Sequence, residues 1–311
     1  MTDVRYNEIN AEEDGQRLDN YLIRILKGVP KSHIYRIIRG GEVRINKKRA
    51  QPSTRLSEGD AVRIPPVRLA SEKEIHVGVK LEQRLNDCIL FEDSGLIVVN
   101  KPTGIAVHGG SGLSLGMIEA LRKTRTDLHY LELVHRLDKE TSGCLLFAKK
   151  RSVLRDVQSL FAERDVKKTY WAILSNPWLG DKKKIVDVPL LRTLRNDGER
   201  FVIVSPDGKP SETRFKILEK YQQACWIEAE PKTGRTHQIR VHSASLGHPV
   251  SGDEKYGKSE APLWPGAGKT RLYLHARSIQ FNLNGVKHYY EAPLDERFSQ
   301  TLQLLRANIV P

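Results

Sequence analysis

Residues 135–143 of this chain read His-Arg-Leu-Asp-Lys-Glu-Thr-Ser-Gly, and this stretch decides how the rest of the sequence is interpreted. It places one carboxylate, Asp138, between two cations, Arg136 and Lys139, and it ends in three small residues. Nearby positive charge favours the ionised form of a carboxylate, so we expect Asp138 to be an anion. The four residues Arg-Leu-Asp-Lys alone are typical of a solvated charge cluster on a turn. The complete nine-residue string indicates a catalytic carboxylate instead.

Further strings extend this pattern along the chain. Residues 100–108 read NKPTGIAVH, residues 232–242 read KTGRTHQIRVH, and residues 168–172 read KTYWA. Together with HRLDKETSG, they resemble the signature motifs of the RluA-type pseudouridine synthases in order and spacing. The resemblance covers roughly residues 85 to 300. On these motifs, the chain is identified as a member of that family.

The resemblance implies an α+β fold with two domains. A small N-terminal RNA-binding domain of the α-L type should precede a pseudouridine synthase catalytic domain with a long, bent, mainly antiparallel sheet flanked by helices. We place the first domain at residues 1–70, a linker at 71–86 and the catalytic domain at 87–311. Local apolar patterns predict strands at 96–100, 144–148, 170–174 and 224–228, and helices at 152–163 and 236–246.

The N-terminal part is a basic unit over residues 17–64. One helix is predicted from Arg17 and a second from Lys31, with Ile34, Ile37 and Ile38 forming its buried stripe. Short strands are predicted at 43–46 and 61–64. The unit resembles the α-L RNA-binding module of a ribosomal small-subunit protein. Its expected RNA-binding residues, placed to contact phosphates, are Lys31, Arg36, Arg39, Lys47, Lys48 and Arg49.

The resemblance also implies roles in the catalytic domain. Asp138 matches the essential catalytic residue, Tyr170 the residue that removes a proton from uracil carbon 5, and Arg240 the arginine that pairs with the carboxylate. Arg235 is the alternative for that pairing. Arg136 matches the residue that fills the gap left by the extruded uridine, since an enzyme acting at buried base atoms must turn its target out of the stack.

Three other features have simpler interpretations. Ile239 is expected either to pack at the RNA-binding cleft or to belong to the core. Lys101, Pro102 and Gly104 are interpreted as architecture, namely a strand end, a turn fixed by proline and a close backbone approach. A phosphate contact by Lys101 is the alternative. The polar segment 192–208 is expected to be a loop or a hairpin.

Composition limits the possible partners. A formal net charge of +13 in 311 residues favours a polyanion such as nucleic acid, and no apolar run is long enough to span a bilayer. Cys88, Cys144 and Cys225 are odd in number and far apart, which indicates a reducing cytoplasm. His237 and His242 are five residues apart and lack an acidic companion, so no metal site is expected. Without a glycine-rich phosphate loop, no cofactor is expected either, and nothing calls for more than a monomer.

The resemblance therefore implies isomerisation of specific uridines to pseudouridine. The layout is most similar to family members that modify 23S rRNA of the large ribosomal subunit, or its precursor, at several sites near the peptidyl-transferase centre. Three alternatives remain open: a synthase acting on other rRNA or tRNA uridines, a catalytically silent RNA-binding assembly factor, and a basic protein whose target is not RNA. The intact trio of Asp138, Tyr170 and Arg240 argues against the silent factor, because a binding protein needs none of the three.

Overall fold

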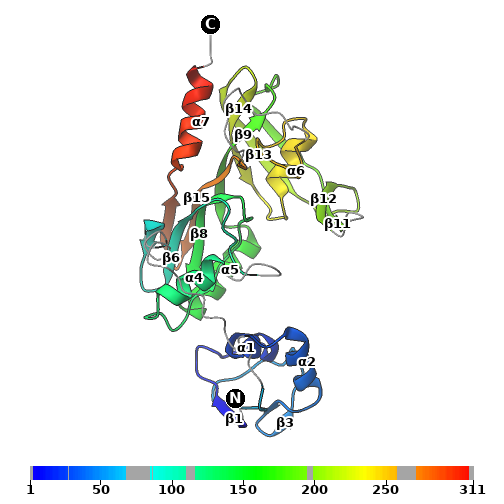
Figure 1. Ribbon diagram of the computed structural model, residues 1–311, viewed down its shortest axis with the longest axis vertical. Coiled ribbons are helices and arrows are strands. Elements are labelled where there is room, and N and C mark those ends of the chain that lie inside the picture. The colour runs from blue at the N-terminus through cyan, green and yellow to red at the C-terminus, as the bar shows by residue number, and fades with distance from the viewer. Residues whose placement is uncertain are drawn as a thin grey trace. The chain divides into compact units, whose positions relative to one another are not determined.

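The computed structural model describes residues 3–26, 28–67, 85, 87–109, 116–194, 199–257 and 271–307. The chain divides into two compact units, Met1–Gly78 and Val79–Pro311, each of which is described by itself (Figure 1). The linker that we predict at residues 71–86 lies almost entirely outside the described residues.

The N-terminal unit packs two helices on a four-stranded sheet. Helix α1 spans Leu18–Ile25 and α2 spans Lys31–Arg39, as the sequence predicts. The strand order is β1-β4-β2-β3, with bounds Arg5–Glu8, Ala61–Ile64, Arg44–Ile45 and Lys48–Arg49.

The hydrophobic stripe of α2 forms much of this unit's core. Ile34, Ile37 and Ile38 are at most 2% exposed and pack in one cluster with residues of α1. Gly41 follows the helix with φ +74°, a conformation that glycine adopts at little cost. The predicted stripe is confirmed.

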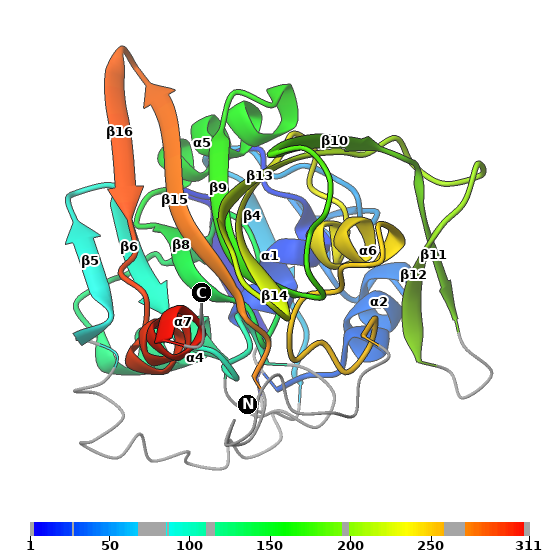
Figure 2. The same ribbon diagram turned by 90° about the horizontal axis from the view of Figure 1, so that it is seen from above.

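A ten-stranded mixed sheet forms the centre of the catalytic unit. Its main path runs β10-β13-β14-β9-β15-β8-β6-β5, while β16 pairs with β15 and β7 pairs with β8. The pairing of β15 with β8 is parallel, and the other pairs are antiparallel. Strands β13, β14 and β9 curve across the view in Figure 2. The bounds are β5 Ile89–Glu92, β6 Leu96–Lys101, β7 Glu132–Leu133, β8 Ser142–Ala148, β9 Lys167–Ser175, β10 Lys183–Asp187, β13 Glu212–Lys220, β14 Ala224–Pro231, β15 Leu274–Leu283 and β16 Val286–Glu291.

The polar segment at 192–208 contains a hairpin. Strand β11, Leu190–Leu194, pairs antiparallel with β12, Arg200–Val204, outside the main sheet. The hairpin lies beside α6, Gln238–Ser245, where Leu190 and Val202 share a small core with Val241 (Figure 2). Of the two predicted forms, the hairpin is the one observed.

Helices cover both faces of the catalytic sheet. Helix α4, Met117–Thr124, and α6 pack on one face, while α5, Arg151–Glu163, and α7, Glu296–Ala307, pack on the other. On the first face, one hydrophobic core forms under α4 and a second under α6. Tyr170 of β9 packs against both cores and so marks the seam between them. The fold is α+β, and the predicted catalytic sheet with flanking helices is confirmed.

Within the described part of the chain, no helix combines the length and apolar character needed to cross a membrane. The three cysteines are free thiols, and Cys144 and Cys225 are buried.

Candidate active site

The loop that carries Asp138 connects β7 to β8 and is anchored near its start by His135. His135 accepts a hydrogen bond at Nε2 from the backbone N–H of Leu146, 3.2 Å away, and its ring stacks on Phe161 with centroids 5.1 Å apart. Burial lowers the pKa of His135 to about 3, so the imidazole is neutral and can accept that bond. Leu137 is 6% exposed and packs in the core under α4. Asp138, with 33% of its side chain exposed, therefore projects from a fixed support.

A buried lysine fixes the second half of this loop. Lys101 is 0% exposed, and its Nζ donates hydrogen bonds to the carbonyls of Pro102, Ile105 and Lys139 at 2.8–2.9 Å. The backbone N–H of Gly104, at φ +80°, donates to the same Lys139 carbonyl at 3.0 Å. Lys101 is thus architectural, as the first interpretation has it. The alternative, a phosphate contact, is wrong because the amine is enclosed by carbonyls.

Glycine lets the loop enter the sheet beside Tyr170. Gly143 has φ +108°, and a Cβ atom there would lie 2.3 Å from the carbonyl oxygen of Ala276. Ala276 pairs with Gly143 on one side and with Tyr170 on the other. This register brings the tyrosine, which lies far along the sequence, to the end of the Asp138 loop. Burial raises the pKa of Tyr170, and the charge of Asp138 raises it further, so the phenol is neutral.

Arg240 lies on α6 and approaches Asp138 from the side of the core under that helix. Its Nη1 lies 3.5 Å from Asp138 Oδ2, and its Nε and Nη2 bond both oxygens of Asp253 at 2.7 Å. The guanidinium is 10% exposed and the Asp253 side chain is 0% exposed. Asp253 therefore holds Arg240 by a buried bidentate pair, which restricts the orientation of the guanidinium toward Asp138. Our sequence reasoning missed Asp253.

His237 is a second residue that sequence reasoning missed. Its Nε2 lies 3.7 Å from Asp138 Oδ2, while its Nδ1 lies 2.7 Å from the hydroxyl of Tyr256. His242 faces elsewhere, and its ring is within 3.1 Å of the hydroxyls of Ser211 and Thr213. Among the described residues, no group of three His, Cys, Asp or Glu side chains could hold a metal ion.

The other predicted site residues differ in their surroundings. Arg136 is exposed, two residues before Asp138. Arg235 donates from Nε to the Pro210 carbonyl at 3.2 Å, so the residue that meets Asp138 is Arg240 rather than this alternative. Ile239 is 6% exposed and packs in the core under α6. This packing matches the core role, and the expected role of Ile239 as an RNA contact stays a prediction.

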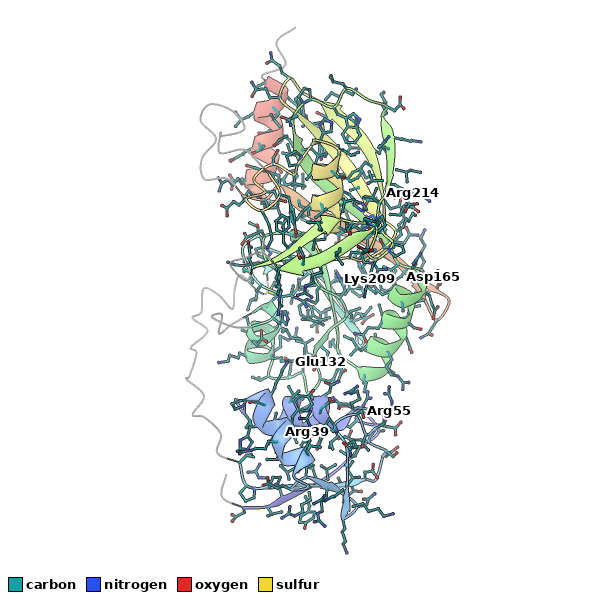
Figure 3. All side chains as sticks on the ribbon, turned by 90° about the vertical axis from the view of Figure 1, so that its right-hand side faces the viewer. Arg39, Arg55, Glu132, Asp165, Lys209 and Arg214 are labelled. Atoms are coloured by element: carbon teal, nitrogen blue, oxygen red, sulfur yellow. The ribbon has the colours of Figure 1, made fainter. Side chains whose placement is uncertain are left out.

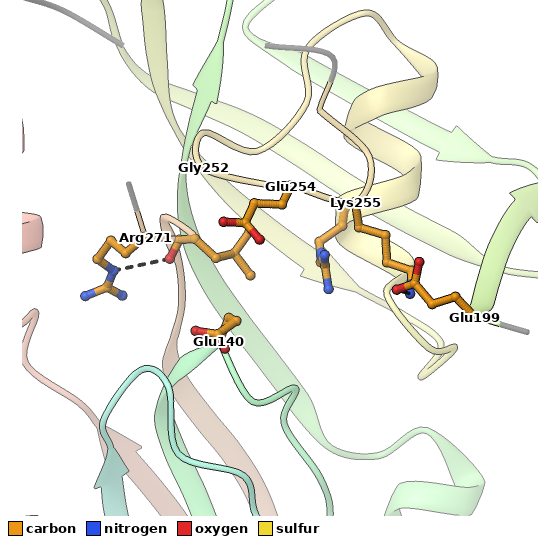
Figure 4. Close-up of a pocket in the computed structure, with 8 residues that line it drawn as sticks. Glu140, Glu199, Gly252, Glu254, Lys255 and Arg271 are labelled. Atoms are coloured by element: carbon orange, nitrogen blue, oxygen red, sulfur yellow. Dashed lines mark hydrogen bonds and ion pairs between the residues drawn. The ribbon is translucent and has the colours of Figure 1, made fainter. Parts of the chain in front are cut away.

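A cavity of about 470 Å³ opens beside Arg240 (Figure 4). Lys255 and Arg271 line it, together with the carboxylates of Glu140, Glu199 and Glu254. The Lys255 ammonium lies 2.6 Å from Glu199, next to the start of β12, so the hairpin forms part of the wall.

The six predicted RNA-binding cations of the N-terminal unit are all exposed. Arg39 is labelled on this unit in Figure 3, and its guanidinium lies 5.8 Å from the Tyr35 ring centroid. The β2–β3 hairpin carries three of the cations: Lys47 lies in its turn, where Asn46 and Lys47 have φ +50° and +69°, and Lys48 and Arg49 form β3. The six residues are Lys31, Arg36, Arg39, Lys47, Lys48 and Arg49.

The fold and the arginine-paired carboxylate can now be compared with known protein families. The family model described as RNA pseudouridylate synthase matches residues 95–245, and the S4 domain model matches residues 16–62. With the relatives below, these matches show that the chain belongs to the RluA-type RNA pseudouridylate synthase family.

Individual relatives match nearly the whole chain. The chain is 51% identical to ribosomal large subunit pseudouridine synthase C of Yersinia pestis, covering 98% of this chain and 97% of that protein. It is 50% identical to the protein of the same name from Escherichia coli K12, covering 97% of each. Among solved structures, human RNA pseudouridylate synthase domain containing 4 is 31% identical with a TM-score of 0.62, covering 73% of this chain and 96% of that one.

Proposed function

We propose that this protein converts specific uridines of 23S rRNA in the large ribosomal subunit to pseudouridines, at several sites near the peptidyl-transferase centre. The observation that carries the proposal is Asp138, held 3.5 Å from the buried Arg240 at the seam marked by Tyr170. The identity of about half over nearly all of the chain, including the RNA-binding unit, supports rRNA as the substrate.

The reaction requires three changes at one nucleotide. The bond from uracil nitrogen to the ribose breaks, the base turns, and carbon 5 joins the sugar. A carboxylate can serve this reaction in two ways: Asp138 attacks or stabilises ribose carbon 1, or it removes a proton from the sugar. Neither way uses a redox step or a metal ion, so we propose that the enzyme works without a cofactor.

The neighbouring residues take supporting roles in this proposal. Arg240 orients the Asp138 carboxylate, and Arg136, which is exposed two residues before Asp138, occupies the space that the extruded uridine leaves. Tyr170 relays the proton from carbon 5 of the rotated base. Because its pKa is raised, Tyr170 starts as a neutral phenol and must pass on its own proton as it accepts the new one. The Asp138 carboxylate, whose charge contributes to that shift, is the acceptor we assign; nitrogen 1, freed from the ribose, gains a proton in exchange, and Asp138 returns to its carboxylate form.

The N-terminal unit docks the RNA. Its six exposed cations neutralise phosphates, so binding weakens as salt concentration rises, while the catalytic unit contacts the target nucleotide. We propose that the protein acts as a monomer in the cytoplasm, where the pre-ribosomal RNA is present.

A map of pseudouridine across rRNA and tRNA tests the proposal. The map is recorded from cells that lack the gene and from the same cells rescued by wild type or by Asp138→Asn. We expect a few 23S positions to lose pseudouridine and to regain it with wild type alone. An unchanged map would contradict the proposal and favour the silent assembly factor. Loss at tRNA positions instead would correct the substrate and leave the chemistry in place.

A further inference from the structure

His237 occupies an unusual backbone conformation beside the catalytic carboxylate. It precedes α6 with φ +52°, in the left-handed region that few residues other than glycine adopt. Only 17% of its side chain is exposed, and the ring lies between two oxygens: Asp138 Oδ2 at 3.7 Å from Nε2 and Tyr256 Oη at 2.7 Å from Nδ1. Residues held in such conformations cluster at functional sites, because the surrounding structure must stabilise them.

The surroundings of Tyr256 decide which ring nitrogen carries the proton. The backbone N–H of Val202 donates to Tyr256 Oη at 3.2 Å, so the hydroxyl proton is available for His237 Nδ1. Burial raises the pKa of Tyr256 to about 12, and burial lowers the pKa of His237, so a neutral phenol faces a neutral imidazole. An imidazole that accepts at Nδ1 carries its own proton at Nε2, facing Asp138. The charged or titratable groups that face His237 are Asp138, Arg240, Asp253, Lys255 and Tyr256.

We propose that His237 is a positioning residue for Asp138, and that Tyr256 holds it in the tautomer whose Nε2–H points at the carboxylate. This inference rests on the proposed function, in which Asp138 is the catalytic group. Arg240 Nη1 and His237 Nε2 approach the same oxygen, Oδ2, at 3.5 and 3.7 Å. With both nitrogens next to Oδ2, Oδ1 is left as the oxygen that acts on the ribose. The pair thus selects which oxygen reacts.

The β11–β12 hairpin supports Tyr256 and extends this arrangement to the cavity wall. The rings of Phe201 and Tyr256 lie 4.7 Å apart, Val202 supplies the N–H to the hydroxyl, and Lys255 is paired with Glu199 next to β12. The hairpin therefore fixes the position of the Tyr256 hydroxyl, and this hydroxyl sets the tautomer of His237. The segment that our sequence reasoning gave only as a polar loop or hairpin contributes to the orientation of the catalytic carboxylate.

Nitrogen NMR on the full chain, labelled with ¹⁵N-histidine, tests the tautomer directly. The His237 signals are assigned by their loss in His237→Gln, and we expect the pattern of an Nε2-protonated ring. Tyr256→Phe should convert it to a mixture of tautomers. The matched control is Tyr221→Phe, which removes a hydroxyl bonded to Glu219 at 2.7 Å, outside the site, and should leave the signals unchanged. An Nδ1-protonated ring in wild type, or no change in Tyr256→Phe, would overturn the proposal.

Two substitutions show whether His237 acts as a hydrogen-bond donor to Asp138 or only maintains the backbone conformation. Asparagine tolerates φ +52° well, but its short amide does not reach the position of Nε2, whereas the glutamine amide does. We expect the single-turnover rate of His237→Gln to stay within about tenfold of wild type and that of His237→Asn to fall further, with equal RNA affinities. If asparagine matched or exceeded glutamine, the residue would serve the backbone only. Pseudouridine formation by wild type tests the proposed function separately, and the tautomer measurement needs no turnover.

Discussion

Removal of the Asp253 carboxylate should be among the most damaging single changes in the catalytic unit. Asp253→Ala deletes both 2.7 Å bonds to Arg240 and leaves a guanidinium that is 10% exposed without its main partner. Breaking a buried ion pair from one side costs about 3–5 kcal/mol, because the remaining charge stays buried and uncompensated. The backbone N–H groups of Lys255 and Tyr256, which donate to Asp253 at 3.0 and 3.1 Å, also lose their acceptor.

Urea unfolding followed by tryptophan fluorescence measures this loss. The described tryptophans Trp171, Trp178 and Trp226 all belong to the catalytic unit, so the signal reports on that unit. With an m-value of about 3 kcal/mol/M, a loss of about 3 kcal/mol lowers the midpoint by about 1 M. In a single-turnover assay the released Arg240 should lower the rate by roughly 100-fold, since small displacements at a reacting centre have effects of this size.

A matched surface pair provides the control. Arg306 bonds Glu219 with the same bidentate geometry, at 2.8 and 2.6 Å, but the side chains are 46% and 33% exposed. Glu219→Ala should change the unfolding free energy by at most about 1 kcal/mol, because solvent screens an exposed pair. Equal midpoint shifts for the two variants, or a loss below about 1 kcal/mol for Asp253→Ala, would refute the reasoning from burial.

Three further predictions concern other parts of the chain. Gly143→Ala should cost about 3 kcal/mol or more in thermal unfolding, from the clash with a β15 carbonyl and the positive φ together; a neutral result would contradict the close approach. His135 and His275 have pKa values lowered to about 3 and 4 by burial, so the unfolded chain binds more protons below about pH 6.5. Stability is therefore complete above that pH and falls as the pH drops from about 6.5 to about 4 for His275 and to about 3 for His135, by up to about 1.4 kcal/mol per pH unit for each ring. Urea unfolding at several pH values should show this, and His135→Gln should reduce the slope. Replacing Arg36 and Arg39 by alanine should weaken RNA binding and reduce the slope of log K against log salt by up to about 1.4–1.8; an unchanged slope would place the phosphates elsewhere.

The sequence predicted those parts of the structure that short-range patterns control. The helix predicted at 152–163 is observed at Arg151–Glu163, because its apolar residues repeat with the helical period. The Asp138 loop and its partner Arg240 were predicted from two long sequence motifs, residues 135–143 and 232–242, through their resemblance to a known family. The predicted roles of Tyr170 and Arg136 stay predictions that turnover measurements must test.

The missed residues depend on contacts between distant segments. Asp253 lies in a polar run without periodicity, and it reaches Arg240 only because the chain folds back against α6. His237 has no local pattern that marks it, since its two partners come from the 135–143 loop and from Tyr256. Such contacts follow from tertiary packing, which a single sequence does not display.

Because Lys101 is enclosed, its amine can report chemically on the opening of the Asp138 loop. The amine donates to three carbonyls of the surrounding backbone and is 0% exposed, so these carbonyls exclude reagents while the loop is closed. An amine-acylating reagent should modify the exposed lysines within seconds to minutes and reach Lys101 only when the loop opens. The time course of that single modification, read by peptide mass, reports the opening of the loop in the native protein, without substrate and without a label.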